Sequence, residues 1–565
     1  MKTLRQPVPK TLLGIPEVDA GHTDLGESQP MRPLPQLRDQ QLPVEVMTLS
    51  HEQILETRTC QWPDEAACAA HAAALARQPT LRDAFIELRG ALGAGKTTFV
   101  RHLLRALGVE GRIKSPSYTV LEPYALAGLT VSHFDFYRLS GPEEARELGF
   151  EDAASDGAVI VEWPERAAAL VPDSRFEISF GEAPDPDARL LTVRGLGEAA
   201  GRARRIGEAM TFLDAEPAWG GARIDYLQGD ASTRSYARLS QDGRTVLLMD
   251  APRQPDGPPI RDGKSYSRIA CLAEDMVRPF VAIGAVLRGA GLSAPGVLAA
   301  ELDKGLLLVE DLGDRLFGSE VAAGTSQALM WRTAVDALVE LRRVPVPKSL
   351  PLPNGTSYSL PRRDRAAFEI EIELLLDWLW PELKGEPAPR AVRAEFHAVW
   401  QPVLDRLLAL PGGWFLRDYH SPNLIWLPER EGVARVGILD FQDALNEYFA
   451  FDLVSLLQDA RVDVPEELER ELFDYYCGEV AAREPGFDRA RFAEAYADFG
   501  AQRNTRLLGL WARLLRRDGK PHYLQHLPRT WGYLERNLRG VTLAPLADWY
   551  ERHFPESVRR QSILP

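Results

Sequence analysis

The sequence predicts two domains in one chain: an α/β domain with a mostly parallel sheet, followed by an α+β domain with a small strand-rich lobe and a large helical lobe. A chain of 565 residues is long enough for several hydrophobic cores. Apolar strands alternate with helices in its first third, and strand-like segments precede long amphipathic helices in the remainder. The expected parts are a disordered or loosely packed leader (1–45), the first domain (46–197), a linker (198–209) and the second domain (210–565), with lobes at about 210–313 and 314–565.

The composition argues against several classes of protein. Lys and Arg number 66 against 81 Asp and Glu, which gives a net charge of −15 and disfavours a broad nucleic-acid-binding surface. The four cysteines form no CxxC pair, so we expect a reducing compartment and neither a disulfide framework nor a zinc site. The chain starts without the apolar segment of a signal peptide and has no run of about 18 apolar residues. We therefore expect a cytoplasmic protein without membrane contact.

The first domain alternates helices and strands in the order typical of a parallel sheet covered by helices. An Ala-rich stretch favours a helix, short apolar runs favour buried strands, and apolar residues at helical spacing follow the first of these strands. The expected helices are 64–78 and 98–107, and the expected strands are 84–88, 130–136 and 158–162.

A phosphate-binding loop lies between the first strand and the second helix, which predicts a P-loop NTPase domain. Residues 90–97 read GALGAGKT and satisfy every fixed position of the G-x-x-x-x-G-K-[ST] pattern. Lys96 supplies a charge for phosphates, and Thr97 supplies a hydroxyl for Mg²⁺. Glu162 ends one of the expected strands, and Asp135 lies near the end of another. A carboxylate that binds the metal is expected at such a position. The expected ATP ligands are Gly90, Gly93, Gly95, Lys96, Thr97 and Thr98.

Five segments in order make this domain resemble the TsaE family, the small bacterial ATPases of tRNA N6-threonylcarbamoyladenosine (t6A) synthesis. The segments are GALGAGKTT (90–98), SPSYT (115–119), HFDFYRL (133–139), ELG (147–149) and VEWPE (161–165). The resemblance implies an ATPase that supports a complex of paralogous partner subunits, which does the tRNA chemistry. Given the acidic balance of the chain, we expect no strong direct binding of tRNA. The resemblance further implies that Glu162 binds the metal or orients water, that Asp135 is a second essential acid, and that 115–119 is a switch-like segment.

The second domain opens with strand-like segments and continues with long amphipathic helices, the outline of a bilobal, protein-kinase-like fold. The expected strands are 223–228, 235–239 and 245–249, and the expected helices include 330–342, 368–379 and 391–408. Pro402 predicts a kink or a break in the last of these helices.

Three polar residues at kinase spacing define a candidate catalytic centre. Asp418 and Asn423 match the R-D-x-x-x-x-N loop, and Asp440 begins a D-F-Q triplet at the place of D-F-G. Asp418 is expected to accept the proton of the substrate hydroxyl, while Asn423 and Asp440 are expected to hold metal ions. Glu310, in the hinge-like segment 306–313, is expected at the nucleotide.

His420 and Pro422 inside this loop are typical of aminoglycoside and choline kinases. Further segments make the domain resemble the anomeric N-acetylmuramate/N-acetylglucosamine kinases (AmgK) of cell-wall recycling, in the aminoglycoside phosphotransferase superfamily. They are GDASTRSY (229–236), MDAP (249–252), VEDLG (309–313), FDLVSLLQDAR (451–461), AQRN (501–504) and RRDGK (516–520). The resemblance implies transfer of the ATP γ-phosphate to the C1 hydroxyl of an amino sugar. Asp452 is expected to brace the catalytic loop.

One position departs from the usual kinase pattern. Met249 stands where the third strand of the small lobe ordinarily carries a Lys. Arg234 is the candidate for the missing charge, and a solvated surface Arg is the alternative. Arg234, Ser232 and Thr233 are the expected nucleotide ligands in the loop above the phosphates.

Arginines recur at partly helical spacing near the end of the second domain. They could meet the lactyl carboxylate of N-acetylmuramate, although a solvated basic helix face is the default expectation. These residues are Arg503, Arg506, Arg513, Arg516 and Arg517.

The combined interpretation is a fusion of two ATP-using domains, each with one site for ATP and Mg²⁺. The first works with the partner subunits of t6A synthesis, and the second acts on N-acetylmuramate or N-acetylglucosamine. Two alternatives stay open. The second half is an aminoglycoside- or choline-type kinase, or one half is a nucleotide-bound scaffold without turnover.

Overall fold

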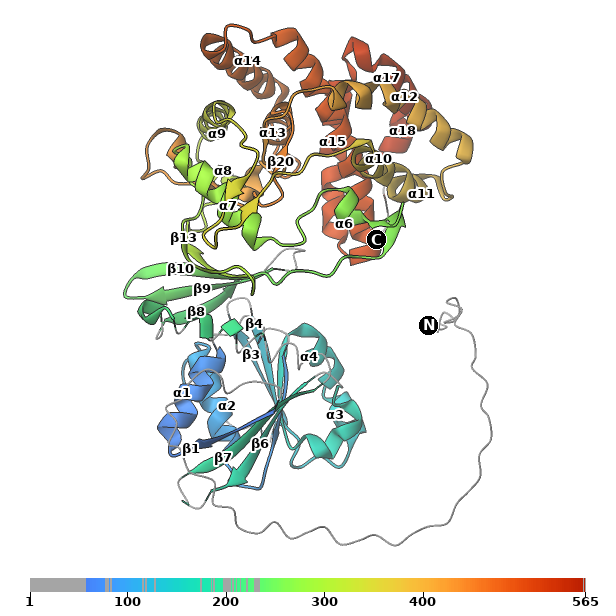
Figure 1. Ribbon diagram of the computed structural model, residues 1–565. Helices are drawn as coiled ribbons and strands as arrows, with labels where there is room; N and C mark the ends of the chain where they lie inside the picture. The colour runs from blue at the N-terminus through green and yellow to red at the C-terminus, as the bar shows by residue number, and fades with distance from the viewer. Residues whose placement is uncertain are drawn as a thin grey trace, which may run out of the picture. The chain divides into compact units, whose positions relative to one another are not determined.

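The computed structural model describes residues 57–565 except for short gaps (Figure 1). The gaps are 77–80, 82–83, 114–115, 117–118, 127–128, 173–174, 184, 186–187, 197–204, 206–207, 210, 214, 220–221, 228–233, 562 and 564–565. The predicted leader and most of the predicted linker lie outside the described residues. So do most of the switch-like segment and two expected nucleotide ligands, namely Ser115, Ser117, Tyr118, Ser232 and Thr233.

The first domain is built on one seven-stranded sheet with the strand order β1-β7-β6-β2-β5-β4-β3. Its strands are β1 (Thr57–Trp62), β2 (Phe85–Arg89), β3 (Leu121–Leu126), β4 (Leu129–Asp135), β5 (Ala158–Glu162), β6 (Arg175–Glu182) and β7 (Arg189–Leu196). The central strands β6, β2, β5 and β4 run parallel, and β1, β7 and β3 are antiparallel to their neighbours. The three predicted strands and the parallel arrangement are thus confirmed for the centre of the sheet.

Helices cover both faces of this sheet (Figure 1). Ile86 and Leu88 belong to one buried cluster with α1 and α2, whereas Phe85 belongs to another with α3 and α4. The split follows from the pleat, because successive side chains of a strand point to opposite faces. The helices are α1 (Glu65–Ala76), α2 (Lys96–Ala106), α3 (Pro142–Glu147) and α4 (Phe150–Asp156).

The small lobe of the second domain is a five-stranded antiparallel sheet with the order β13-β14-β10-β9-β8. Met249 and Leu307 belong to the buried cluster that includes α7, while Leu248 lies on the opposite face. Arg205, which lies inside the predicted linker, forms an ion pair with Asp250 of this sheet (Nε to Oδ1 2.8 Å). The elements are β8 (Arg223–Leu227), β9 (Ser235–Gln241), β10 (Arg244–Asp250), α7 (Val277–Gly289), β13 (Val297–Glu301) and β14 (Leu306–Glu310).

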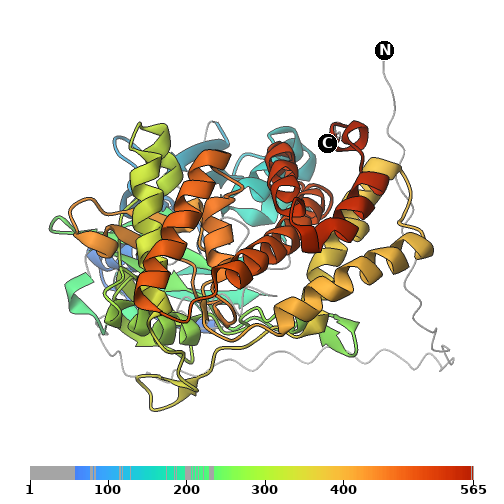
Figure 2. The same ribbon diagram turned by 90° about the horizontal axis from the view of Figure 1, so that it is seen from above.

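The large lobe is arranged around α15 (Arg489–Asp518), a helix of 30 residues that contacts α10, α12, α13 and α16. Figures 1 and 2 show helices of the lobe on either side of it. They are α8 (Phe317–Ala322), α9 (Gln327–Arg342), α10 (Arg365–Leu374), α11 (Trp380–Lys384), α12 (Arg390–Leu408), α13 (Ala450–Leu457), α14 (Glu466–Arg483), α16 (Leu527–Leu538), α17 (Ala544–His553) and α18 (Glu556–Arg559). A π-helical turn, η5 (Leu375–Leu379), joins α10 to α11.

The break predicted at Pro402 is absent, because α12 continues through this residue as one helix. Pro402 lies on the exposed side of the helix. The carbonyl group that loses its amide partner one turn earlier can therefore be solvated, which lowers the cost of the proline.

Two short antiparallel pairs frame the candidate catalytic loop. β17 (Trp414–Phe415) pairs with β20 (Leu445–Asn446), and β18 (Leu424–Trp426) pairs with β19 (Val436–Ile438). The segment with Asp418 joins β17 to β18, and the segment with Asp440 joins β19 to β20, so the pairing brings both segments together. The remaining short elements are β11 (Pro259–Arg261), β12 (Lys264–Ser265), α6 (Tyr266–Ile269), β15 (Leu350–Pro351) and β16 (Ser357–Tyr358).

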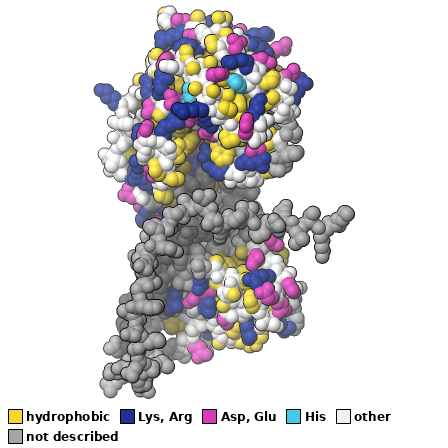
Figure 3. All heavy atoms as spheres, turned by 90° about the vertical axis from the view of Figure 1, so that its right-hand side faces the viewer, with side chains coloured by type: hydrophobic (Ala, Val, Ile, Leu, Met, Phe, Trp, Pro, Cys, Tyr) yellow, Lys and Arg dark blue, Asp and Glu magenta, His cyan; other side chains and the backbone are white. Residues whose placement is uncertain are grey.

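The surface and the helices of the described part agree with the composition. Basic and acidic side chains are interspersed on the face of the large lobe seen in Figure 3. None of the helices within the described ranges combines the length and the apolar character needed to cross a membrane. Cys68, Cys271 and Cys477 are free thiols.

Gly509 sets the distance between α15 and the α10–η5 segment. A Cβ at this position would collide with backbone atoms of Leu374 and Leu375. Glycine is therefore required by the close approach of two helices and not by the backbone conformation of α15.

We predict that Gly509→Ala destabilises the kinase-like domain. Ala is the better helix former by about 1 kcal/mol, but overpacking this contact costs about 1–3 kcal/mol. Scanning calorimetry of the full chain should show a lower Tm for the transition of this domain. The matched control is Gly532→Ala in α16, where a Cβ meets no atom within 4 Å. An unchanged or raised Tm for Gly509→Ala would contradict the close helix contact.

Candidate active sites

The phosphate loop of the first domain joins β2 to α2 at the edge of the sheet where β4 and β5 also end. Gly95 has a left-handed φ of 103° immediately before α2. A Cβ on Gly90 would lie 2.8 Å from the carbonyl oxygen of Phe180. Both positions therefore require glycine, and the loop presents its backbone and the N-terminus of α2 to an anion.

Lys96, the first residue of α2, folds back over this loop. Its Nζ donates to the carbonyl oxygens of Gly90 at 2.7 Å and Ala91 at 3.0 Å, and it lies 3.9 Å from the centre of the Trp163 ring. Burial lowers the pKa of the Lys96 ammonium, and Glu162 opposes the shift. The charge is thus held at the loop, within reach of phosphate groups bound there.

Thr97, Glu162 and His133 form a hydrogen-bonded group beside Lys96. Thr97 Oγ1 donates to the Glu162 carboxylate, with 2.9 Å to each oxygen, and His133 Nε2 lies 3.0 Å from Glu162 Oε1. Asp135 is the register partner of Glu162 on the neighbouring strand and accepts the N–H of Tyr137 at 3.1 Å. The structure therefore brings the predicted Thr97, Glu162 and Asp135 together.

His133 also belongs to this group, although no role is expected for it from the sequence motifs. It is fully buried on β4, two residues before Asp135, so both side chains point to the same face as Glu162. The alternation of side chains along a strand, with its period of two residues, is the sequence signal that could have identified His133.

The donors at this site fit a Mg²⁺ ion. A threonine hydroxyl and a carboxylate are hard oxygen ligands of the kind that Mg²⁺ prefers beside phosphates. Thr97 and Glu162 are in contact, so one ion could be shared by both. Thr98 lies half-buried in the first turn of α2.

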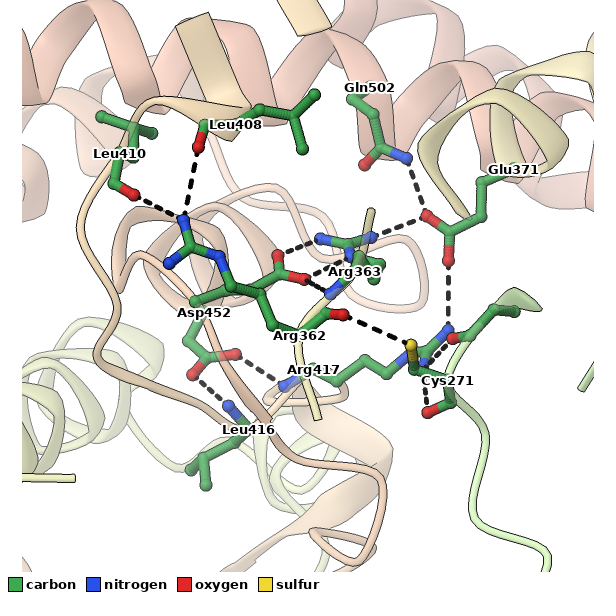
Figure 4. Close-up of polar contacts among 12 residues, drawn as sticks. Cys271, Arg362, Arg363, Glu371, Leu408, Leu410, Leu416, Arg417, Asp452 and Gln502 are labelled. Atoms are coloured by element: carbon green, nitrogen blue, oxygen red, sulfur yellow. Dashed lines mark hydrogen bonds and ion pairs between the residues drawn. The ribbon is translucent and has the colours of Figure 1, made fainter. Parts of the chain in front are cut away.

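The catalytic loop of the second domain is held by Asp452 of α13 (Figure 4). The carboxylate of Asp452 accepts the backbone N–H groups of Leu416 at 2.6 Å and Arg417 at 2.9 Å. Burial raises the pKa of Asp452 to about 7, and the two N–H donors oppose the rise. Arg417 has a left-handed φ of 75°. The expectation that Asp452 braces the loop is confirmed. Its hydrogen bonds hold the backbone at Leu416 and Arg417, directly before Asp418.

The three candidate catalytic residues lie in adjoining segments. Asn423 Nδ2 donates to the backbone carbonyl of Asp418 at 3.0 Å, and the N–H of Leu439 donates to the carbonyl of Asn423 at 2.9 Å. Ser421 N–H donates to the carboxylate of Asp459 at 2.7 Å. The loop and the residue before Asp440 are thus fixed to each other by backbone hydrogen bonds.

Arg234 lies at Asp440, where it forms an ion pair. Gln442 Nε2 also donates to Asp440 at 2.8 Å, and Asp440 has a left-handed φ of 57°. Burial opposes ionisation, but Arg234 and Gln442 outweigh it and hold the pKa of Asp440 below its ordinary value. Asn423 and Asp440 supply oxygen atoms that fit Mg²⁺.

In the described part of the small lobe, neither β10 nor α7 carries its member of the usual kinase ion pair. Met249 is fully buried on β10, facing the cluster that includes α7. The sequence of α7 is VRPFVAIGAVLRG, which contains no acid. In protein kinases a Lys on this strand pairs with a Glu of the corresponding helix. The two differences are consistent with each other. Because the Lys and the Glu are both missing, no buried charge is left there without its partner.

Glu310 and Arg238 stabilise the hinge region. Glu310 accepts the N–H of Gly296 at 3.0 Å and pairs with Arg430 at 2.8 Å. Arg238 of β9 pairs with Asp311 at 2.6 Å and Asp314 at 2.7 Å. The carboxylate of Glu310 is therefore engaged within the protein, and Arg238 is a hinge residue that the sequence analysis did not identify.

A buried ion network lies behind the catalytic loop (Figure 4). The Glu371 carboxylate accepts from Arg363 at 2.7 Å, Arg417 at 3.1 Å and Gln502 at 2.8 Å. Arg363 also pairs with Glu447 at 2.7 Å. Burial opposes ionisation of Glu371, but the neighbouring arginines, Arg363 first, lower its pKa to about 2. The network therefore stays ionised and ties α10 and α15 to the loop.

Two family models match the chain. The model described as threonylcarbamoyl adenosine biosynthesis protein TsaE matches residues 62–190. The model described as phosphotransferase enzyme family matches residues 223–494. Each match falls on one of the two folded parts.

Individual proteins match the same parts. An N-acetylmuramate/N-acetylglucosamine kinase of Caulobacter vibrioides is 40% identical over 357 residues, which cover 62% of this chain and 96% of that protein. A tRNA threonylcarbamoyladenosine biosynthesis protein TsaE of Haemophilus influenzae is 37% identical over 115 residues, which cover 20% of this chain and 73% of that protein. The solved structure of an ADP-bound aminoglycoside phosphotransferase matches 58% of this chain and 96% of its own, with 14% identity and a TM-score of 0.36.

We predict that Asp452→Ala destabilises the kinase-like domain by about 2–5 kcal/mol, because two buried N–H groups lose their acceptor. The measurement is the Tm of this domain in the full chain. Asp463→Ala is the matched control, since Asp463 is exposed and its pair with Arg529 (3.4 Å) is of the surface kind. Equal effects of the two substitutions would show that Asp452 does not support the loop.

Proposed function

Because this chain belongs to the TsaE family over its N-terminal part and to the N-acetylmuramate/N-acetylglucosamine kinase family over its C-terminal part, we propose that it has two separate ATP-dependent activities. The N-terminal domain hydrolyses ATP in support of t6A synthesis by partner subunits. The C-terminal domain phosphorylates N-acetylmuramate and N-acetylglucosamine at the anomeric hydroxyl. Both activities take place in the cytoplasm.

In the N-terminal domain, the contact of Thr97 with Glu162 beside Lys96 carries the proposal. Lys96 and the glycine loop bind the phosphates of ATP, while Thr97 and Glu162 hold Mg²⁺. Asp135, next to Glu162, is the second essential acid. His133 fixes the orientation of Glu162 through their 3.0 Å contact. ATP hydrolysis supports partner subunits that carry out the tRNA chemistry. The chain is acidic, so it is not expected to bind tRNA strongly itself.

In the C-terminal domain, the fixed placement of Asp418 next to Asn423 and Asp440 carries the proposal. Asp418 accepts the proton of the C1 hydroxyl while the oxygen attacks the γ-phosphorus of ATP and ADP leaves. Asn423 and Asp440 hold Mg²⁺, which when bound offsets the negative charge of the phosphates. Arg234, at Asp440, supplies the positive charge that Met249 cannot provide.

The first test of the sugar kinase is phosphoryl transfer followed by phosphorus NMR. The full chain is incubated with ATP, Mg²⁺ and one acceptor at a time: N-acetylmuramate, N-acetylglucosamine, choline or kanamycin. We expect a sugar 1-phosphate from both amino sugars, and we expect Asp418→Asn to lower its rate by about 10²–10⁴-fold, since it removes the general base. Product from choline or kanamycin alone would move the domain to the aminoglycoside/choline class.

The independence of the two activities gives a second prediction. Lys96→Ala should abolish ATP hydrolysis measured with the t6A partner subunits and leave sugar phosphorylation unchanged, because Lys96 serves only the first nucleotide site. Asp418→Asn should have the reverse effect. If either substitution removed both activities from a folded protein, the two sites would not act separately.

A further inference from the structure

A stripe of arginines runs along α15 toward the catalytic loop of the kinase domain. Arg503, Arg506, Arg513 and Arg517 recur at helical spacing and so lie on one side of this helix. Arg513 lies over the ring of Tyr266, the first residue of α6, at 5.0 Å. The stripe thus passes beside the start of α6 at Arg513.

The end of this stripe nearest Asp418 is fixed by two sets of hydrogen bonds. Gln502 of α15 and Arg417 of the catalytic loop both donate to the carboxylate of Glu371 (Figure 4). On the next residue of the helix, Arg503 Nη1 donates to the carbonyl of Gln458 at 3.0 Å. The residue after Gln458, Asp459, accepts the N–H of Ser421 in the catalytic loop. Gln502 and Arg503 of α15 are therefore linked, through Glu371 and through the 458–459 segment, to two points of the loop that carries Asp418.

The arginines of α15 differ in how their charges are compensated. At the surface, Arg516 pairs with Glu382 and Arg517 pairs with Asp518, as the default expectation of a solvated basic face requires. Arg503, by contrast, is only 5% exposed. Within the described residues, Arg503 donates a hydrogen bond to a neutral carbonyl, and its acidic neighbours are Asp459 and Asp418.

Arg506 carries a second positive charge next to Asp418. Its electrostatic neighbours are Glu371, Tyr266, Asp418 and Arg363, and within the described ranges no hydrogen bond from Arg506 is present. Glu371 already accepts from three other side chains. Burial opposes the charge of Arg506, but its acidic neighbours, Glu371 first, outweigh burial and raise its pKa. The guanidinium therefore stays charged, and its N–H groups can donate to a carboxylate on the acceptor.

We propose that Arg506, assisted by Arg503, binds the carboxylate of the lactyl group of N-acetylmuramate and thereby makes the kinase prefer this acceptor to N-acetylglucosamine. The proposal rests on the sugar kinase activity proposed above. The two sugars differ in this lactyl ether, which adds one carboxylate and leaves the anomeric hydroxyl unchanged. The planar guanidinium matches a carboxylate with two parallel hydrogen bonds. A cationic acceptor such as an aminoglycoside is disfavoured by the same charges.

The test compares kcat/KM for the two sugars in the full chain carrying Arg506→Gln. We expect kcat/KM for N-acetylmuramate to fall by about 10–100-fold, the effect of losing a charged hydrogen-bonded pair, while the value for N-acetylglucosamine changes little. Arg506→Lys should recover part of the loss. Arg516→Gln, on the same helix and paired with Glu382 at the surface, is the matched control and should change neither value.

A second measurement changes the substrate and leaves the protein intact. The methyl ester of N-acetylmuramate keeps the shape of the acceptor but has no charge, so the unmodified chain should use it with a kcat/KM close to that for N-acetylglucosamine. Equal loss for both sugars in Arg506→Gln would overturn the proposal and assign Arg506 to ATP or to Asp418. Undiminished use of the methyl ester would overturn it as well. Failure of the unmodified chain to phosphorylate either sugar would instead contradict the proposed function.

Discussion

The buried carboxylate of Glu371 is the point on which the geometry of the kinase-like domain depends. It accepts hydrogen bonds from Arg363, from Arg417 of the catalytic loop and from Gln502 of α15. Removing one partner of such a buried set leaves a charge without compensation, which costs far more than the pair itself contributes. The position of Asp418 relative to α15 is therefore fixed by one ionised group that does not touch the reacting atoms.

In the proposed mechanisms, the two domains position phosphates by different means. The first relies on a backbone loop in which glycines leave no side chains in the way, with Lys96 folded over it. The second relies on side chains carried by separate segments, with Arg234 at Asp440 and an apolar Met249 on the strand. Met249 replaces the usual Lys and α7 has no acidic residue, so these two features of the small lobe are consistent with each other. In the proposed mechanism, Arg234 beside Asp440 supplies the charge that the strand does not carry.

Local patterns predicted the fold class and the loops that carry chemistry, but they could not predict the long-range pairs. The phosphate loop and the spacing of Asp418 and Asn423 are short motifs whose backbone geometry is encoded nearby. The role of Glu371, by contrast, depends on the packing of α10 and α15 behind the candidate catalytic loop, and the arginine pattern alone could not separate Arg506 from the solvated arginines of α15. No spacing in the chain reveals that contact. Pro402 failed as a break signal because exposure of the helix outweighed a local rule.

The left-handed backbone at Arg417 and Asp440 has a consequence for how this domain can change. Such conformations cost non-glycine residues of order 1–3 kcal/mol each, and the surrounding structure has to supply that energy. Glycine or asparagine would suit the backbone at Asp440 better, yet neither offers a carboxylate to a metal ion. Selection for thermal robustness and selection for turnover therefore act in opposite directions at this position. Under the proposed role of Asp440 as a Mg²⁺ ligand, a chain optimised only for stability would lose kinase activity at this position.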